Sequence, residues 1–347
     1  MHMADALLSP AVGATMWAGS LAALGYSSRK LQENIDNKTI PLMGVMGAFI
    51  FAAQMINFSI PGTGSSGHLG GGMILAALLG PYAAFLVMAS VLTVQALFFA
   101  DGGLLALGCN IWNLGIYPCF IAYPLIYKPI AGNGTSTQRL SMAAILGALI
   151  ALQLGAFSVV LETLLSGKSE LPFGTFVLFM QPIHLAIGLV EGFVTAGIIS
   201  YVQNARPEFL ENNDTSRPQA SDIPVKNILI AFVIITGITG GTLSWFASTQ
   251  PDGLEWSIEK ITGKGELALQ EKGIASVLQG IQEKTAFLPD YNFQPTSPAA
   301  ARDEKPASWP AVAAGTSVAG LLGSTIVLGL VLLIGFGIRS FKKRQSS

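Results

Sequence analysis

Runs of apolar residues, separated by short polar clusters, extend along most of the chain. A helix needs roughly 20 apolar residues to cross the hydrocarbon of a bilayer, and the stretch from Thr39 to Ala100 contains no Asp, Glu, Lys or Arg. Breaks at Gly, Pro and polar residues predict membrane spans at 8–27, 40–58, 69–80, 82–100, 104–127, 141–165, 173–203, 226–248 and 311–338. We therefore predict an all-α polytopic membrane protein, with a seven-helix transmembrane bundle and two further transmembrane helices that flank an extracytoplasmic loop.

A polar stretch with several prolines at residues 206–225 separates the first seven spans from the last two, and it predicts a cytoplasmic linker. We expect one domain at 1–205 and a second at 226–347, whose helices at 226–248 and 311–338 flank the loop 249–310. Within this loop the sequence PDGLEW at 251–256 is typical of a turn that opens a helix. Helical spacing is also kept by Ile274, Val277, Leu278 and Ile281.

The positions of the basic residues predict the orientation of the spans. Lys and Arg concentrate in short cytoplasmic loops. If the amino terminus lies outside, the basic residues of the short loops and the carboxyl-terminal tail fall inside, and Lys168 alone falls in a short outside loop. We therefore predict an extracytoplasmic amino terminus and a cytoplasmic carboxyl terminus.

The composition agrees with a membrane location and excludes some functions. Charged residues make up 11% of the chain and hydrophobic residues 51%, whereas a soluble domain carries about 25% charged residues. The net charge of -1 offers no overall basic surface for nucleic acid. Both cysteines, Cys109 and Cys119, lie in apolar sequence, so no disulfide framework is predicted.

The amino-terminal sequence MHMADALLSP lacks the basic residues of a secretory signal. Because His2 is too bulky for the usual removal of the initiator Met, we expect a free Met1 amine followed directly by His2. The amine and the His2 amide nitrogen form a five-membered chelate with a metal, and the His2 imidazole adds a six-membered one. Planar nitrogen sites favour Ni(II) or Cu(II), whereas zinc prefers a tetrahedron. A histidine at position 2 can equally be incidental.

A fourth nitrogen could come from His68 or His184, the remaining histidines. His68 lies in PGTGSSGHLGGG, on a predicted outside loop on the same side of the membrane as Met1. The glycines of this loop allow its backbone to approach another segment closely. The loop lacks the Lys and Ser/Thr of a phosphate-binding loop, so no nucleotide site is predicted. The alternative interpretation is a flexible loop with an incidental histidine.

His184 and Glu191 are seven residues apart and share one helix face. Ionisable residues at membrane depth are functional candidates. These two side chains could pair with each other, anchor the helix in the bundle or help to carry a metal inward. The position of His184 after Pro182 favours a structural role.

Three segments together, MHMADALLSP, SSGHLGGG and HLAIGLVEGFVT (184–195), resemble the substrate-binding component of energy-coupling-factor cobalt/nickel transporters, the CbiM/NikM family. Residues 226–347 resemble the small CbiN/NikN partner, fused here in the same chain. The resemblance implies that Met1, His2 and His68 hold the metal. It also implies separate partners: a transmembrane coupling protein of the CbiQ/NikQ type and cytoplasmic ATPase subunits of the CbiO/NikO type. Residues 3–6 depart from the MHIPDGFL start of many relatives, which leaves the metal preference open.

We therefore predict a substrate-specificity component, in the plasma membrane of a prokaryotic cell, that captures Ni(II) or Co(II) outside for ATP-driven uptake by other subunits. The metal is a transported ligand and not a catalytic cofactor, and the chain is not predicted to be an enzyme. One alternative is a scaffold subunit of a transporter. Another is an intramembrane metalloenzyme, which needs an open metal position and a general base.

Overall fold

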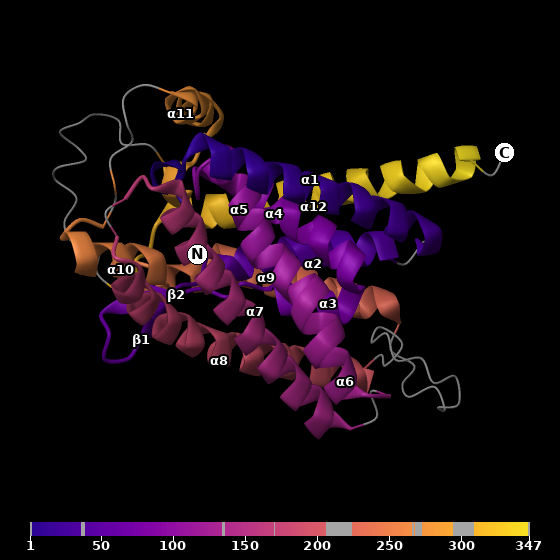
Figure 1. Cartoon of the computed structure of the whole chain (residues 1–347). Helices are drawn as coiled ribbons and strands as arrows, with labels where there is room; N and C mark the ends of the chain where they lie inside the picture. The colour runs from indigo at the N-terminus through magenta and orange to yellow at the C-terminus, as the bar shows by residue number, and fades with distance from the viewer. Residues whose placement is uncertain are drawn as a thin grey trace.

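The computed structural model describes residues 2–35, 39–133, 136–169, 171–205, 224–265, 267, 273–293 and 309–345. In chain order the elements are η1 (Asp5–Leu7), α1 (Pro10–Asn34), α2 (Thr39–Gln54), β1 (Phe58–Ile60), β2 (Ser65–Gly67), α3 (Gly72–Leu79), α4 (Pro81–Phe99), α5 (Leu107–Ile111), η2 (Trp112–Tyr127), α6 (Lys128–Ala131), α7 (Thr137–Ser166), α8 (Phe173–Ala205), α9 (Val225–Gly241), η4 (Leu243–Phe246), α10 (Gly253–Thr262), α11 (Ile274–Thr285), η5 (Pro289–Tyr291) and α12 (Ala314–Gln345). Figure 1 shows these helices gathered into one bundle.

Helices form at each of the predicted apolar segments. Four of them, α4, α7, α8 and α12, have the length and hydropathy needed to cross a membrane, while α2 and α9 are apolar but shorter. The segment predicted at 69–80 contains only the eight-residue helix α3, which is too short to span a bilayer by itself. The mostly helical class is confirmed, and the count of seven plus two spans stays a prediction.

The centre of the bundle is formed by helices that are apolar on all sides, as expected for buried helices. From Leu42 to Gln54 every residue of α2 is buried, and so is every residue of α3 from Gly72 to Leu78. Around them, α12, α9 and α4 pack against α2, and η2 packs against α3 and α7. The long helices α7 and α8 run side by side (Figure 1).

The chain between α5 and α6 winds as a π-helix, η2, which contains Pro118 and Pro124. A proline lacks the N–H that an α-helix needs and its ring crowds the preceding turn, and wider π turns are a known local response inside helices. The predicted span at 104–127 is thus helical, with a local geometry that the hydrophobic pattern did not predict.

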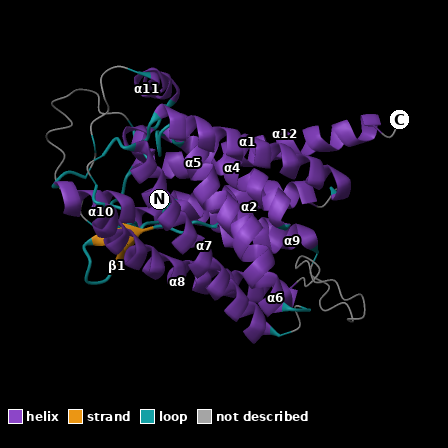
Figure 2. Cartoon of the chain, in the orientation of Figure 1, coloured by secondary structure: helices purple, strands orange, loops and turns teal. Residues whose placement is uncertain are grey.

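A short antiparallel hairpin interrupts the helical fold between α2 and α3 (Figure 2). Phe58 pairs with Gly67 and Ile60 with Ser65. The turn between the strands places Gly62 and Gly64 at φ +78° and +75°, a conformation that glycine adopts at low cost. This hairpin ends directly before His68, and the hydrophobic pattern did not predict it.

The carboxyl-terminal portion confirms two predicted local features. PDGLEW opens α10, whose N-cap Asp252 accepts hydrogen bonds from the backbone N–H groups of Leu254 and Glu255, an arrangement that satisfies free donors at a helix start. The residues with helical spacing in the predicted loop form α11. Of the predicted linker 206–225, residues 206–223 lie outside the described part of the chain.

Gly323 marks the close approach of α12 to α2 and α4. A methyl group at this position would lie 2.1 Å from Cζ of Phe51 and 2.9 Å from Cζ of Phe99. We expect Gly323→Ala to overpack this contact and to lower the free energy of unfolding by about 1–3 kcal/mol, measured as a lower thermal midpoint in detergent.

Gly329→Ala is the matched control, because within the described residues a Cβ at position 329 of the same helix meets no atom within 4 Å. We expect its thermal midpoint to equal or exceed that of the wild type, because Ala favours a helix more than Gly does. Equal midpoints for the Gly323 and Gly329 variants would contradict the close packing of α12.

Candidate metal centre

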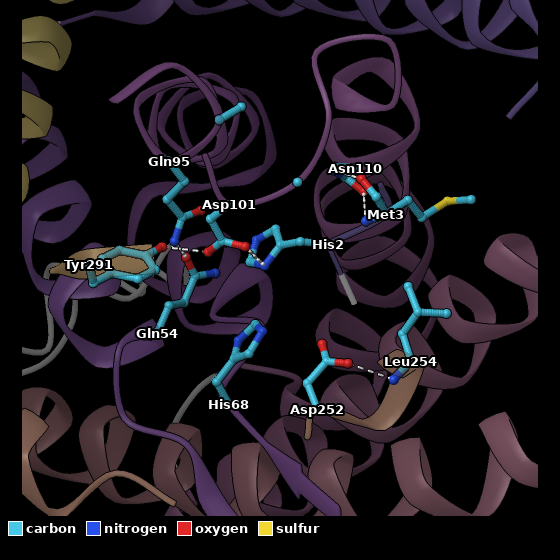
Figure 3. A network of polar contacts seen from close by, with 12 residues as sticks. His2, Met3, Gln54, His68, Gln95, Asp101, Asn110, Asp252, Leu254 and Tyr291 are labelled. Atoms are coloured by element: carbon cyan, nitrogen blue, oxygen red, sulfur yellow. Dashed lines mark hydrogen bonds and ion pairs between the residues drawn. The ribbon is translucent and has the colours of Figure 1, made fainter. Parts of the chain in front are cut away.

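His2 and His68, which the sequence analysis singled out as metal ligands, lie face to face (Figure 3). Their ring centroids are 5.1 Å apart and the ring planes differ by 11°. His2 precedes η1 and His68 follows β2, so the fold brings the amino terminus onto the glycine-rich loop. Met1, the third predicted ligand, lies outside the described residues.

The backbone next to His2 is fixed by the segment that follows α4. The N–H of Met3 donates to Oδ1 of Asn110 over 2.8 Å, and the N–H of Gly103 donates to the carbonyl of Met3 over 2.9 Å. A few residues later, Oδ1 of Asp5 accepts from the N–H of Ala106 over 2.9 Å. These hydrogen bonds pair the buried backbone of residues 3–5 with the segment at 103–110.

The ring of His68 is oriented so that one nitrogen remains available for a metal. Nδ1 lies 3.0 Å from the carbonyl oxygen of Leu69, and since a carbonyl only accepts, Nδ1 carries the proton. Nε2 then holds the lone pair that a metal needs. Burial lowers the pKa of His68 to about 3, so the imidazole stays neutral at physiological pH.

Glu191 of α8 holds the glycine-rich turn between His68 and α3. Its Oε2 accepts the N–H of Gly70 over 2.6 Å, at the turn that leads into α3. The positive end of a helix stabilises a carboxylate placed there. Nε2 of Gln54 donates to the carbonyl of Gly70 over 2.8 Å, so Gly70 is fixed on both sides.

His184 and Glu191 are both buried in the bundle but are not hydrogen-bonded to each other. Nδ1 of His184 donates to the carbonyl of Met180 over 2.7 Å. Nε2 of His184 is buried and has no hydrogen-bond partner among the described residues. Of the three roles left open for this pair, anchoring therefore describes Glu191, through the turn that carries His68.

Asp101 lies beside His2, a contact that the sequence analysis did not predict. Nδ1 of His2 is 3.1 Å from Oδ1 of Asp101, and the side chain of His2 is 7% exposed. The hydroxyl of Tyr291 donates to Oδ2 of the same carboxylate. Burial alone would raise the pKa of Asp101, but its contacts with His2 and the hydrogen bond from Tyr291 outweigh this effect and hold the pKa below its usual range.

The predicted chelate makes a specific demand on His2. Only Nδ1 closes a six-membered ring with the His2 amide nitrogen, because Nε2 lies one bond further away. In the structure Nδ1 is engaged by Asp101, while Nε2 is buried and unpartnered within the described chain. The nitrogen that the predicted chelate requires is therefore the one that contacts Asp101.

The carboxyl-terminal portion packs against the hairpin that precedes His68. The N–H of Ser66 donates to the carbonyl of Pro251 over 2.8 Å, and the N–H of Ser248 donates to the carbonyl of Asn57 over 2.7 Å. A cavity of about 10 Å³ remains between His68, His184 and Asp252, which is room for about one water molecule.

Among the described residues, no three His, Cys, Asp or Glu side chains are grouped closely enough to hold a metal ion. Two imidazoles alone are too few ligands for a planar four-coordinate metal. The described side chains alone therefore do not form a complete metal site.

Comparison with protein families gives this geometry its context. Residues 2–209 match the family described as the cobalt uptake substrate-specific transmembrane region, CbiM. Residues 226–340 match the PDGLE domain. Because the first match covers more than half of the chain, the chain belongs to the CbiM family, and the predicted resemblance is confirmed.

Individual relatives agree with this assignment. The chain is 32% identical, over 346 residues, to the putative fused nickel transport protein NikMN of Archaeoglobus fulgidus, and the match covers 99% of each chain. It is also 32% identical, over 225 residues, to the fused nickel transport protein NikMN of Rhodobacter capsulatus, covering 60% of this chain and 64% of that one.

A crystal structure described as a transition metal transporter is 30% identical, with a TM-score of 0.52, and the match covers 58% of this chain and 92% of that one. Together with the two NikMN relatives, these names confirm the prediction of a transport component rather than an enzyme.

Glu191 offers a direct test of how the turn beside His68 is held. Glu191→Ala leaves the buried Gly70 N–H without its acceptor, which should cost about 1–3 kcal/mol. We expect a lower thermal midpoint and faster hydrogen exchange of the amides at residues 70–73. Glu191→Gln keeps one acceptor oxygen and should show a smaller effect.

The control for this experiment is Val190→Ala, because Val190 neighbours Glu191 in α8 but is 37% exposed. Its exchange rates at residues 70–73 should match those of the wild type. If Glu191→Ala also leaves these rates unchanged, the carboxylate does not hold the turn.

Proposed function

We propose that this chain is the substrate-specificity component of an energy-coupling-factor importer that captures Ni(II) or Co(II) outside the cell. Residues 1–205 form the metal-binding domain, and residues 226–347 form the accessory domain fused to it. A separate transmembrane coupling protein and cytoplasmic ATPase subunits supply the driving force. The amino terminus faces outward and the carboxyl terminus lies in the cytoplasm, as the distribution of basic residues predicts.

The stack of His2 on His68 is the observation that carries this proposal. Nε2 of His68 and Nδ1 of His2 supply two nitrogens, and the His2 amide and the Met1 amine supply two more. A planar set of four nitrogens favours Ni(II), and low-spin Co(II) accepts the same geometry. A metal whose four coordination positions in one plane are all occupied has no open position for a reactive water. This geometry disfavours the metalloenzyme alternative.

Relatives named for both metals support the substrate class. The Archaeoglobus fulgidus relative, named as a putative nickel transport protein, matches the chain over almost its whole length. A cobalt transport protein, CbiM of Geobacter sulfurreducens, is 26% identical over 277 residues. Competition between Ni(II), Co(II) and Cu(II) on the purified chain measures which metal this site prefers.

The proposal is tested by changing the ligands in the full chain with an authentic amino terminus. One extra residue before Met1 moves the free amine away from His2, and His68→Ala removes one nitrogen. Since loss of even outer-shell partners costs about 10–100-fold in metal affinity, we expect each change to weaken Ni(II) binding by more than about a hundredfold, measured by titration calorimetry.

His184→Gln is the matched control, because it removes the remaining histidine of the chain and leaves the proposed ligands intact. It should bind Ni(II) as the wild type does. A scaffold subunit would tolerate the amino-terminal extension without any change in metal binding, and wild-type protein that binds neither Ni(II) nor Co(II) would refute the proposed function.

A further inference from the structure

Asp101 connects the two portions of the chain at the metal ligand His2 (Figure 3). One oxygen of its carboxylate pairs with Nδ1 of His2, and the other accepts the hydroxyl proton of Tyr291. Tyr291 belongs to η5 in the carboxyl-terminal portion. The nitrogen that Asp101 occupies is the one that the proposed chelate requires, so Asp101 and the metal compete for it.

The backbone at Asp290 and Tyr291 adopts an unfavourable conformation. Asp290 and Tyr291 have φ of +50° and +58°, values that are rare for residues other than glycine and that mark an outlier for a bulky side chain. Such strain persists where the surroundings hold it, and it clusters at functional positions. Here it aims the hydroxyl of Tyr291 at Asp101.

Apolar and polar contacts fix the positions of Tyr291 and Asp101. The ring of Tyr291 stacks on Phe99, with centroids 5.1 Å apart and planes 14° apart. Nε2 of Gln282, on α11, donates to the carbonyl of Ala96 over 2.8 Å and to that of Gly102 over 2.7 Å. These two carbonyls lie on either side of Asp101 in the sequence, so α11 and η5 fix the segment that presents it.

Building on the proposed function, we propose that Asp101 and Tyr291 form a positioning pair that sets how readily a divalent metal takes Nδ1 of His2. While Asp101 accepts from Nδ1–H, the imidazole cannot chelate. When a metal takes Nδ1, this hydrogen bond breaks, Nδ1 gives up its proton and Nε2 takes one up, so the neutral imidazole still carries one proton. The carboxylate of Asp101 accepts hydrogen bonds from both the Tyr291 hydroxyl and Nδ1 of His2. Because the carboxylate is shared, its hydrogen bond to His2 is weaker.

The direction of each effect follows from this competition. In Asp101→Asn the acceptor is neutral, and charge-assisted hydrogen bonds are roughly twice as strong as neutral ones, so we expect Ni(II) association to accelerate by about fivefold. In Tyr291→Phe the ring stacking remains but the donor is lost. Asp101 then accepts only from His2, and association should slow by a similar factor.

The experiment measures Ni(II) association and dissociation on the full chain, purified with a free amino terminus, by stopped-flow absorption of the planar nickel complex. The wild type, both single variants and the double variant form a thermodynamic cycle that isolates coupling between the two positions. Tyr201→Phe is the control, because Tyr201 is 53% exposed near the end of α8.

We expect Tyr291→Phe to slow association in the wild-type background and to change it by less than about twofold in the Asp101→Asn background, with dissociation unchanged throughout. A Tyr291→Phe effect of equal size in both backgrounds would show a merely structural role and would overturn the pair. Faster dissociation with unchanged association in Asp101→Asn would also overturn it, since Asp101 would then support the bound state. If the wild type binds no metal, the proposed function fails instead.

Discussion

A buried carboxylate at the start of a short helix fixes the geometry on which the site depends. Glu191 reaches across the bundle from α8 and accepts the N–H of Gly70 at the turn into α3. In a low-dielectric interior such a hydrogen bond is strong, and leaving either group unpaired is expensive. The start of α3 also requires glycine at position 72, because a Cβ there would lie 2.3 Å from Cγ of Pro118. The direction of the chain, and with it His68, is thereby set.

Polar side chains orient the two segments that carry His2 and His68. Asn110, Gln54 and Asp101 contact Met3, Gly70 and His2, respectively. Loops that carry function are usually positioned by a rigid scaffold, and here the helices α2 and α5 supply Gln54 and Asn110.

The carboxyl-terminal portion is part of this arrangement and not a separate appendage. Its backbone pairs with the hairpin at Ser66, and its Tyr291 contacts the carboxylate beside His2. Covalent linkage makes such contacts intramolecular, which raises their effective concentration without any new interaction. The portion that matches the CbiM family and the portion that matches the PDGLE domain are thus in direct contact.

Apolar runs and capping residues are local properties, so the sequence predicts the helical segments and the helix that PDGLEW opens. It left open whether His2 meets His68 or His184, and only the packed chain shows the stack of His2 on His68. The hairpin, the π-helix and the contacts of Asp101 with His2 and Tyr291 also appear only in the packed chain. In the sequence, Asp101 is typical of a turn. Tyr291 lies far from it along the chain, in a segment without hydrophobic periodicity. Contacts between residues far apart in the chain cannot be predicted from the local sequence pattern, because burial and hydrogen bonding depend on how the segments pack.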